Sequence, residues 1–305
     1  MSASRESPLS SRSLQLRKIE RFCRPNGRIG DSYRYKPLSY FALVFVLSWA
    51  PWSFAAYYSY QRAMELCSNL FALLGLLGPF FAALIMTWSS GSRDLKHDFK
   101  ERLVDLRLIR PGYVPVILLL TPFALFLSTW LSVGVGRSAD QFRFSGGFAT
   151  MLPLILVAPT FEELGWRGYG MDSLRAKFGM MKATLLFGFL WAMWHVPLFF
   201  IDRSYQHGLW NSSPIYVANF FISILPAAIL MNWVYYKNNR SIVAAILFHM
   251  ALDATAEAFR TEKFTKCIWT GVLLLISILV IAGNRSFFFE EKKPERGLWM
   301  VGGFG

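Results

Sequence analysis

Long apolar blocks separated by short polar segments dominate the chain after its first 36 residues. A helix needs about 20 mostly apolar residues to cross the hydrocarbon core of a bilayer, and the blocks have roughly this length. The pattern predicts about eight membrane-spanning helices, at residues 38–58, 66–88, 112–135, 147–164, 180–201, 214–236, 241–259 and 267–284. The predicted fold class is therefore all-α, as a polytopic transmembrane helix bundle.

The apolar blocks predict a single membrane-embedded domain, residues 37–286, between two polar ends. Residues 1–36 are basic and rich in serine, which favours a disordered cytoplasmic tail; an organelle transit peptide stays an alternative for this segment. Residues 287–305 are predicted to form a short cytoplasmic tail. Residues 92–110 mix both signs of charge with apolar residues at helical spacing, which predicts an amphipathic helix on the membrane surface.

The distribution of basic residues predicts the orientation of the bundle, because cytoplasmic loops carry an excess of Lys and Arg. If the amino terminus lies inside, 25 of the 32 basic residues fall in cytoplasmic segments and seven in outer ones. Both termini are therefore predicted to be cytoplasmic. We expect a multi-pass integral membrane protein, located in the plasma membrane.

Composition agrees with a membrane protein and changes the interpretation of the net charge. The chain is 54% hydrophobic and 17% charged, whereas soluble domains are about 45–50% apolar and about 25% charged. Its net charge of +13 could indicate nucleic acid, but the basic residues lie between apolar blocks. We interpret them as topology signals that contact anionic lipid at the cytoplasmic face, and we expect no nucleic-acid partner.

Polar residues inside the apolar blocks are informative, because a charge there costs at least about 2.5–3.5 kcal/mol. One group ends the fourth block. Glu163 and Arg167 are four residues apart and can pair on one helical face. Glu162 then has no local partner, which suits a general base; the alternative is an interfacial salt bridge at a helix end.

Two further groups contain histidine. His195 lies among aromatic residues in the fifth block, close to Pro197; a lone histidine there is more often a satisfied core residue. His249 and Asp253 are four apart in the seventh block, so they share a helical face. Asp253 could orient His249 or bind a reacting carbonyl, or the two could only bridge neighbouring spans. Together the three groups predict either a metal site or a glutamate-activated water site.

These residues resemble the motifs of the CPBP family, the CAAX-protease-like intramembrane proteases. That family includes the type II CAAX prenyl proteases and bacterial relatives linked to bacteriocin self-immunity and lysostaphin resistance. The E-E-x-x-x-R motif matches from Glu162 to Arg167, and H-x-x-x-D matches from His249 to Asp253. The F-x-x-x-H motif matches at His195 except that Trp191 replaces the phenylalanine.

The resemblance implies an all-helical bundle with a cavity open to the cytoplasm. Glu162 would activate water with His195 close by, while His249 and Asp253 would stabilise the oxyanion of the tetrahedral intermediate. The spans place Glu162 near the cytoplasmic end of its helix but His195 about 18–23 Å along its own. Either the fifth span is tilted and broken near Pro197, or its boundary is misplaced. The implied catalytic residues are Glu162, Glu163, His195, His249 and Asp253, with Arg167 and Trp191 as positioning residues.

A metal is an open alternative at this site. Glu162, His195 and His249 make a plausible zinc set, but the sequence fits a reaction without metal equally well. The predicted function is an endopeptidase that uses glutamate-activated water to cut a membrane-embedded or membrane-associated peptide or protein, and prenylated substrates are included in this prediction. The alternatives are a catalytically silent scaffold or immunity protein on the same fold, and a transporter with a proton relay; no internal repeat favours the transporter.

Overall fold

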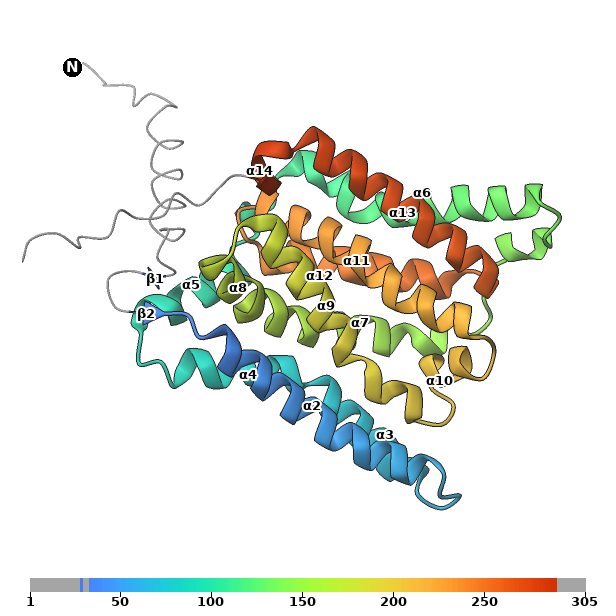
Figure 1. The fold of residues 1–305 in the computed structure, drawn as a ribbon, viewed down its shortest axis with the longest axis horizontal. Coiled ribbons are helices and arrows are strands. Elements are labelled where there is room, and N and C mark those ends of the chain that lie inside the picture. Colours follow the sequence, from blue (N-terminus) through green and yellow to red (C-terminus); the bar gives the residue numbers. More distant parts are fainter. Residues whose placement is uncertain (1–27, 30–32, 290–305) are drawn as a thin grey trace, which may run out of the picture.

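The computed structural model describes residues 28–29 and 33–289. Nearly all of these residues are helical, and the helices run side by side in one bundle (Figure 1), so the predicted all-α class is confirmed. The long helices are α2 (Pro37–Ser59), α6 (Val114–Gly134), α7 (Phe148–Gly165), α9 (Met180–Trp194), α11 (Pro214–Lys237), α12 (Ile242–Ala258) and α13 (Lys263–Gly283). The shorter ones are α3 (Glu65–Leu76), α4 (Gly78–Trp88), α5 (Arg93–Val104), α8 (Met171–Lys177), α10 (Tyr205–Trp210) and α14 (Arg285–Phe289).

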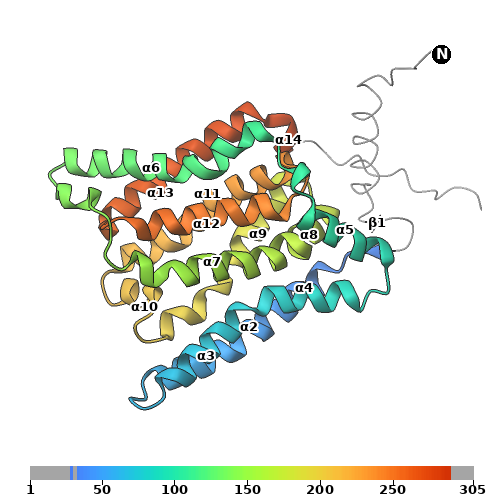
Figure 2. The same ribbon diagram turned by 180° about the vertical axis from the view of Figure 1, so that it is seen from behind.

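Six helical runs in the described residues are long and apolar enough to cross a membrane, or up to seven if the bent pair of α3 and α4 is one span. This shows an integral membrane protein, whereas the count of eight stays a prediction that depends on α12. That helix has 17 residues and lies alongside α7 (Figure 2). Ala258, at its end, accepts a 2.8 Å hydrogen bond from Ser145 just before α7 begins, so α12 extends as far as its neighbour.

The predicted end of the fourth span at residue 164 is wrong. After α7 the chain continues through a π-helical turn, Trp166–Gly170, into α8, and the whole run Phe148–Lys177 has 30 residues. The polar residues that suggested a membrane boundary are buried inside the protein, because distant segments supply their partners. The fourth span is therefore much longer than its apolar block.

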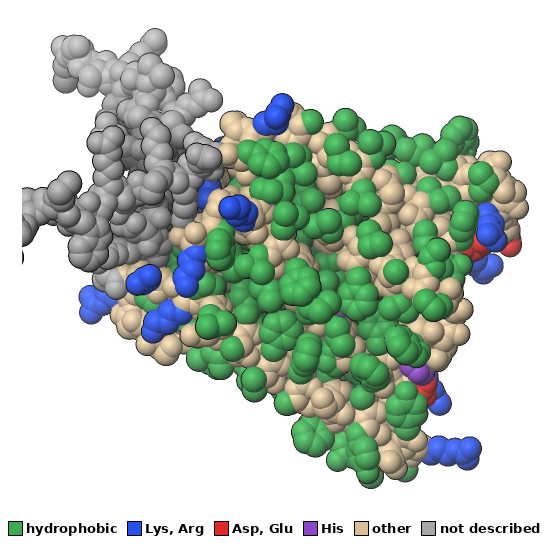
Figure 3. Space-filling view, in the orientation of Figure 1, with side chains coloured by type: hydrophobic (Ala, Val, Ile, Leu, Met, Phe, Trp, Pro, Cys, Tyr) green, Lys and Arg blue, Asp and Glu red, His purple; other side chains and the backbone are tan. Residues whose placement is uncertain are grey.

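Both ends of the described chain lie at the same end of the bundle. The backbone N–H of Lys36, just before α2, donates to the Tyr169 hydroxyl at 3.0 Å. Phe287 of α14 packs against Tyr236 near the end of α11, with ring centroids 6.3 Å apart. We call this the basic end, since it also carries residues 92–110, and the opposite end the far end. Figure 3 shows a broad hydrophobic surface between the two.

Described structure is present before residue 37, within the segment 1–36 that the sequence assigned to a disordered tail. Residues 33–34 form strand β2, which pairs with β1, residues 28–29, in a two-stranded antiparallel ladder. Tyr33 and Tyr35 are buried against Tyr169. The remaining tail predictions fall on residues 1–27, 30–32 and 290–305, outside the described residues.

The amphipathic segment is more deeply integrated than a surface helix. Ser92 caps α5 by accepting a hydrogen bond from the Leu95 backbone at 3.2 Å. The buried face of α5 includes Asp98 and Arg102, which are 4% and 3% exposed. The helix therefore packs charged side chains into the basic end of the bundle.

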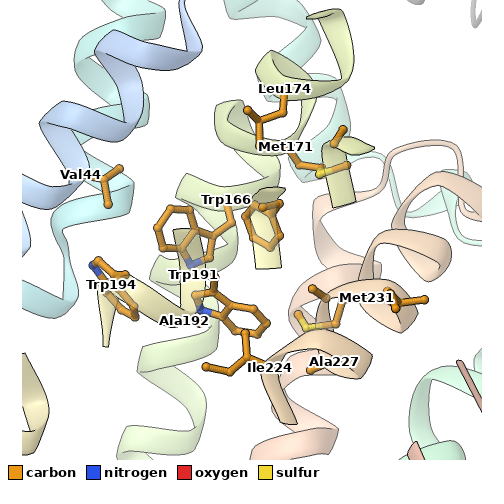
Figure 4. Packing of buried hydrophobic residues seen from close by; sticks show 14 of the residues in the cluster. Val44, Trp166, Met171, Leu174, Trp191, Ala192, Trp194, Ile224, Ala227 and Met231 are labelled. Atoms are coloured by element: carbon orange, nitrogen blue, oxygen red, sulfur yellow. The ribbon is translucent and has the colours of Figure 1, made fainter. Parts of the chain in front are cut away.

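Close helix packing fixes where α7 lies. Gly165 faces α4 so closely that a Cβ atom there would lie 2.3 Å from the Pro79 carbonyl carbon. On the other side, Trp166, Trp191 and Trp194 form an aromatic core that meets α11 near Ile224 (Figure 4). Small residues at helix contacts let backbones approach, so α7 is held tightly between α4 and the tryptophan core.

Candidate active site

Glu162 lies in the middle of the long helical run Phe148–Lys177. Glu162 lies 15 residues before the end of that run, and His195 lies 15 residues after the start of α9. At 1.5 Å per residue both are about 22 Å along their helices from the basic end, so the expected difference in depth is absent. Its side chain is buried, at 6% exposure. Its Oε2 atom accepts hydrogen bonds from the indole N–H groups of Trp166 at 3.3 Å and Trp191 at 3.2 Å. The two indoles fix one carboxylate oxygen and leave Oε1 available to a ligand.

Trp191 explains the departure from the F-x-x-x-H pattern. A phenylalanine at this position could not donate to Glu162. The Trp191 ring also lies between the two histidines, with its centroid 6.0 Å from that of His195 and 5.5 Å from that of His249. One side chain thus contacts three of the candidate catalytic residues.

Glu163 and Arg167 form a fully buried ion pair, as their spacing predicts. Both are 0% exposed, and Arg167 Nη1 lies 2.9 Å from Oε1 and 2.8 Å from Oε2 of Glu163. Arg167 Nη2 donates to Asn232 Oδ1 at 3.0 Å, and Asn232 in turn donates to Thr184 at 3.3 Å. The carboxylate and the guanidinium are thereby locked to α9 and α11.

His249 lies between two carboxylates. Its Nδ1 is 3.0 Å from Glu163 Oε1, and its Nε2 is 3.8 Å from Asp253 Oδ1. Glu163 is already paired with Arg167, so its oxygen accepts and Nδ1 carries the proton. Nε2 is left for a ligand, because Asp253 lies beyond hydrogen-bond distance and the contact that orients the ring is the one with Glu163.

His195 is at the point where α9 ends and a 3₁₀ turn, Val196–Phe200, begins. Pro197 has no N–H to continue the helical ladder, which favours the break here. His195 Nδ1 donates to the Trp191 carbonyl oxygen at 2.8 Å. Because a carbonyl only accepts, the neutral ring has its lone pair on Nε2. That atom can accept a hydrogen bond from a water molecule.

These side chains line one cavity of about 1240 Å³. Its wall includes Glu162, Trp191, His195, His249 and Asp253. Glu163 and Arg167 are not on the wall and act through their contacts to His249. The structure therefore brings together all seven residues that the sequence singled out, with five exposed to the cavity and two behind it.

The cavity reaches the surface at the far end, where Arg62, Glu65, Asp202 and Arg203 line it. The side chains of Glu65 and Arg203 there are 73% and 79% exposed. The family resemblance implied a cytoplasmic opening, whereas the charge distribution predicts that the basic end is cytoplasmic. The cavity opens opposite the basic end, so these two expectations are incompatible.

Among the described residues no three His, Cys, Asp or Glu side chains are grouped closely enough to hold a metal ion. His249 Nδ1 bonds to Glu163 and His195 Nδ1 to a backbone carbonyl, which leaves the two Nε2 atoms as the ring nitrogens that a metal could bind. The zinc set of Glu162, His195 and His249 stays a prediction, and the chemistry proposed for the site uses the side chains alone.

Two residues of the site were missed by sequence reasoning. Asn232 and Trp166 contact Arg167 and Glu162, respectively. Asn232 did leave a signal, since an amide inside an apolar block needs a polar partner. Trp166 left none, because tryptophan is common at membrane boundaries and its indole N–H finds its partner only in the folded bundle.

Comparison with known proteins agrees with these motifs. Residues 144–255 match the model of the family described as type II CAAX prenyl endopeptidase Rce1-like. The chain is similar to CAAX prenyl protease 2 of Methanococcus maripaludis, with 42% identity over 267 residues. That alignment covers 86% of this chain and 98% of the relative.

Proposed function

Because this chain belongs to the family of CAAX prenyl proteases, we propose that it is an intramembrane endopeptidase that uses glutamate-activated water on a prenylated protein. The observation that carries the mechanism is the environment of Glu162. It is a buried carboxylate at the cavity wall, held through one oxygen by two indole N–H groups. Its second oxygen can hold and deprotonate a water molecule.

The steps follow from the hydrogen-bond roles of the side chains. Water binds between Glu162 Oε1 and the lone pair of His195 Nε2. Glu162 takes one proton as the water oxygen attacks the scissile carbonyl carbon, giving a tetrahedral oxyanion. The protonated His249 ring donates from Nε2 to that oxyanion, while Glu163 holds the ring through Nδ1 and Asp253 lies beside Nε2 as a nearby negative charge. The C–N bond then breaks as Glu162 returns the proton to the leaving amine.

Glu163 and Arg167 act behind the cavity wall. Their pair holds the Glu163 oxygen that contacts His249 Nδ1 at 3.0 Å. This contact fixes which face of the imidazole ring and which nitrogen point to the substrate. Glu163 is thus a positioning residue in this mechanism, although the sequence placed it among the catalytic residues.

The cavity suits a substrate with an apolar group. Leu73 of α3 and Met151 and Leu154 of α7 line it, and all three are at least 40% exposed. They make an apolar wall along which an isoprenoid chain can lie. The scissile bond would be the one that follows the prenylated cysteine of a C-terminal C-a-a-X motif.

The test uses purified protein in liposomes and a prenylated peptide with a fluorophore and quencher on either side of the cysteine. We expect wild-type protein to cleave it and Glu162→Gln to lose about 10²- to 10⁴-fold in rate, the usual contribution of a general base. Asp140→Asn is the control, since Asp140 lies on the far-end surface with its side chain 64% exposed. Full activity of a folded Glu162→Gln protein would refute the mechanism.

A silent scaffold on the same fold predicts a different result. In that alternative, Glu162→Gln and His249→Ala both keep the full cellular phenotype. Residence in the plasma membrane and contact of the basic end with anionic lipid also belong to the proposal. Fractionation of cells and flotation with vesicles of defined anionic content test these two points separately.

A further inference from the structure

A line of charged side chains leads from the catalytic residues toward the far end of the cavity. His249, Asp253 and Glu257 follow one another at four-residue spacing on α12, and all three line the cavity. At 1.5 Å per residue, Glu257 lies about 12 Å beyond His249 along the helix. The cavity wall is therefore acidic until the point where α13 begins to face it.

At that point Lys266 of α13 projects into the cavity wall. Its Nζ atom is 4.0 Å from Glu257 Oε1, and the Lys266 side chain is only 16% exposed. Nζ also lies 4.7 Å from the centroid of the Tyr205 ring. A lysine ammonium has three donors, and the Glu257 oxygen lies beyond hydrogen-bond distance. The half-buried cation thus has donors free for a ligand.

Other cations around the cavity are less suited to bind an anion. Lys263 also lines it, but its ammonium donates to the Gly208 carbonyl at 3.1 Å and to the Ser212 hydroxyl. Arg203 approaches the carboxylates of Asp202 and Glu65 and its side chain is 79% exposed. An exposed ion pair contributes little, because water and salt screen it. Lys266 is the cation whose burial would make a charge contact strong.

We propose that Lys266 binds the C-terminal carboxylate of the substrate, an inference that rests on the proposed function. A C-a-a-X motif ends three residues after its prenylated cysteine. Three extended residues span about 10 Å, close to the about 12 Å that separates His249 from Glu257 on α12. With the scissile carbonyl at His249, the terminal carboxylate reaches Lys266. The distance between His249 and Lys266 then selects substrates in which three residues follow the prenylated cysteine.

Glu257 has a defined part in this arrangement. In the free protein the Glu257 carboxylate lies 4.0 Å from the Lys266 ammonium, and the Glu257 side chain is 42% exposed. It can turn toward water when the substrate carboxylate arrives, so the ammonium exchanges one partner for a closer one. Recognition therefore requires a free C-terminal carboxylate at the distance from the scissile bond that places it beside Lys266.

The experiment compares three prenylated peptides: one with a free C-terminal carboxylate, its C-terminal carboxamide, and a free acid longer by one residue. We expect wild-type protein to prefer the free acid of the correct length by roughly ten- to hundredfold in kcat/KM, the range for a hydrogen bond to a charged group. Lys266→Met should cleave the acid and the amide at similar rates. Lys263→Met, the matched control, should keep the wild-type preference.

Two results would overturn the assignment: equal cleavage of acid and amide by wild-type protein, or an unchanged preference in Lys266→Met. Both leave the proposed protease function intact, because cleavage still occurs. If neither peptide is cleaved, the proposed function fails instead. Binding of fluorescent acid and amide peptides to the Glu162→Gln protein then tests Lys266 without catalysis, with the same expected preference.

Discussion

Arg167→Met isolates what the buried ion pair does for the active site. Arg167 and Glu163 are both 0% exposed, and Arg167 contributes two contacts to Glu163, of 2.8 and 2.9 Å. Removing the guanidinium leaves a carboxylate buried without its cation, which costs about 3–5 kcal/mol. Asn232 loses its 3.0 Å bond as well, which adds about 1 kcal/mol because the amide keeps its bond to Thr184. We therefore expect the free energy of unfolding to fall by about 4–6 kcal/mol.

The double variant Glu163→Gln/Arg167→Met separates charge from packing. A neutral glutamine needs no cation, and its amide oxygen can still accept from His249 Nδ1. Replacing both members of a buried pair is often nearly neutral. The double variant should therefore recover most of the stability that the single variant loses, and the negative coupling energy between the two changes should be several kcal/mol.

The assay is reversible unfolding in mixed micelles by titration with a denaturing detergent, followed by tryptophan fluorescence. Activity on the prenylated peptide is measured in parallel, with Lys177→Met as a surface control near the end of α8. A loss of less than about 1 kcal/mol in Arg167→Met would contradict this prediction and would mean that water or lipid head groups reach Glu163. A double variant as unstable as the single one would also contradict it, because the loss would then come from packing of the guanidinium and not from the charge of Glu163.

Three further predictions address the basic end, the orientation and the metal. Arg102→Lys keeps the charge but loses the guanidinium that donates to the carbonyls of Arg167 at 2.6 Å and Gly168 at 2.9 Å. It should lower the free energy of unfolding by about 1–3 kcal/mol in the same titration. No change would show that the π-helical turn does not need these two hydrogen bonds. Single cysteines are introduced as Gln61→Cys or Lys177→Cys into a chain without its native cysteines, and an impermeant thiol reagent is added to intact cells. If the basic end is cytoplasmic, the reagent should label Gln61→Cys and not Lys177→Cys. The reverse pattern would place the cavity opening in the cytoplasm. Activity should stay within about twofold after treatment with a metal chelator, and a loss that zinc restores would return the metal set to the site.

The sequence was sufficient for the elements and for local pairs. Apolar blocks of membrane-spanning length predicted the helices, because only a helix satisfies all backbone polar groups of one segment in lipid. The four-residue spacing predicted the contact between Glu163 and Arg167 that the structure contains. Both inferences use only neighbours along the chain. The grouping of Glu162, His195 and His249 needed the family motifs, since no local rule says which helices converge.

What the sequence could not supply were the partners from distant segments. Arg167 looked like a membrane boundary because its partner Asn232 is 65 residues away. The same holds at the basic end, where Arg240 contacts Asp98 at 2.8 Å and Asp172 at 2.6 Å. Charged side chains can lie inside the bundle when residues from distant segments neutralise them. The apolar block therefore underestimated the length of the helical run that contains Arg167.

The two adjacent glutamates illustrate how one fold can bury two carboxylates and use them differently. Neighbouring residues on a helix point about 100° apart, so Glu162 and Glu163 face different surroundings. Glu163 pairs with the Arg167 guanidinium and accepts a hydrogen bond from the His249 imidazole, so its position is fixed from two sides. Glu162 accepts hydrogen bonds from the neutral N–H groups of two indoles, both on one oxygen. Glu162 therefore keeps its other oxygen at the cavity wall, which is the property that a base for water requires, and Glu163 supplies the rigid neighbour that the histidine needs.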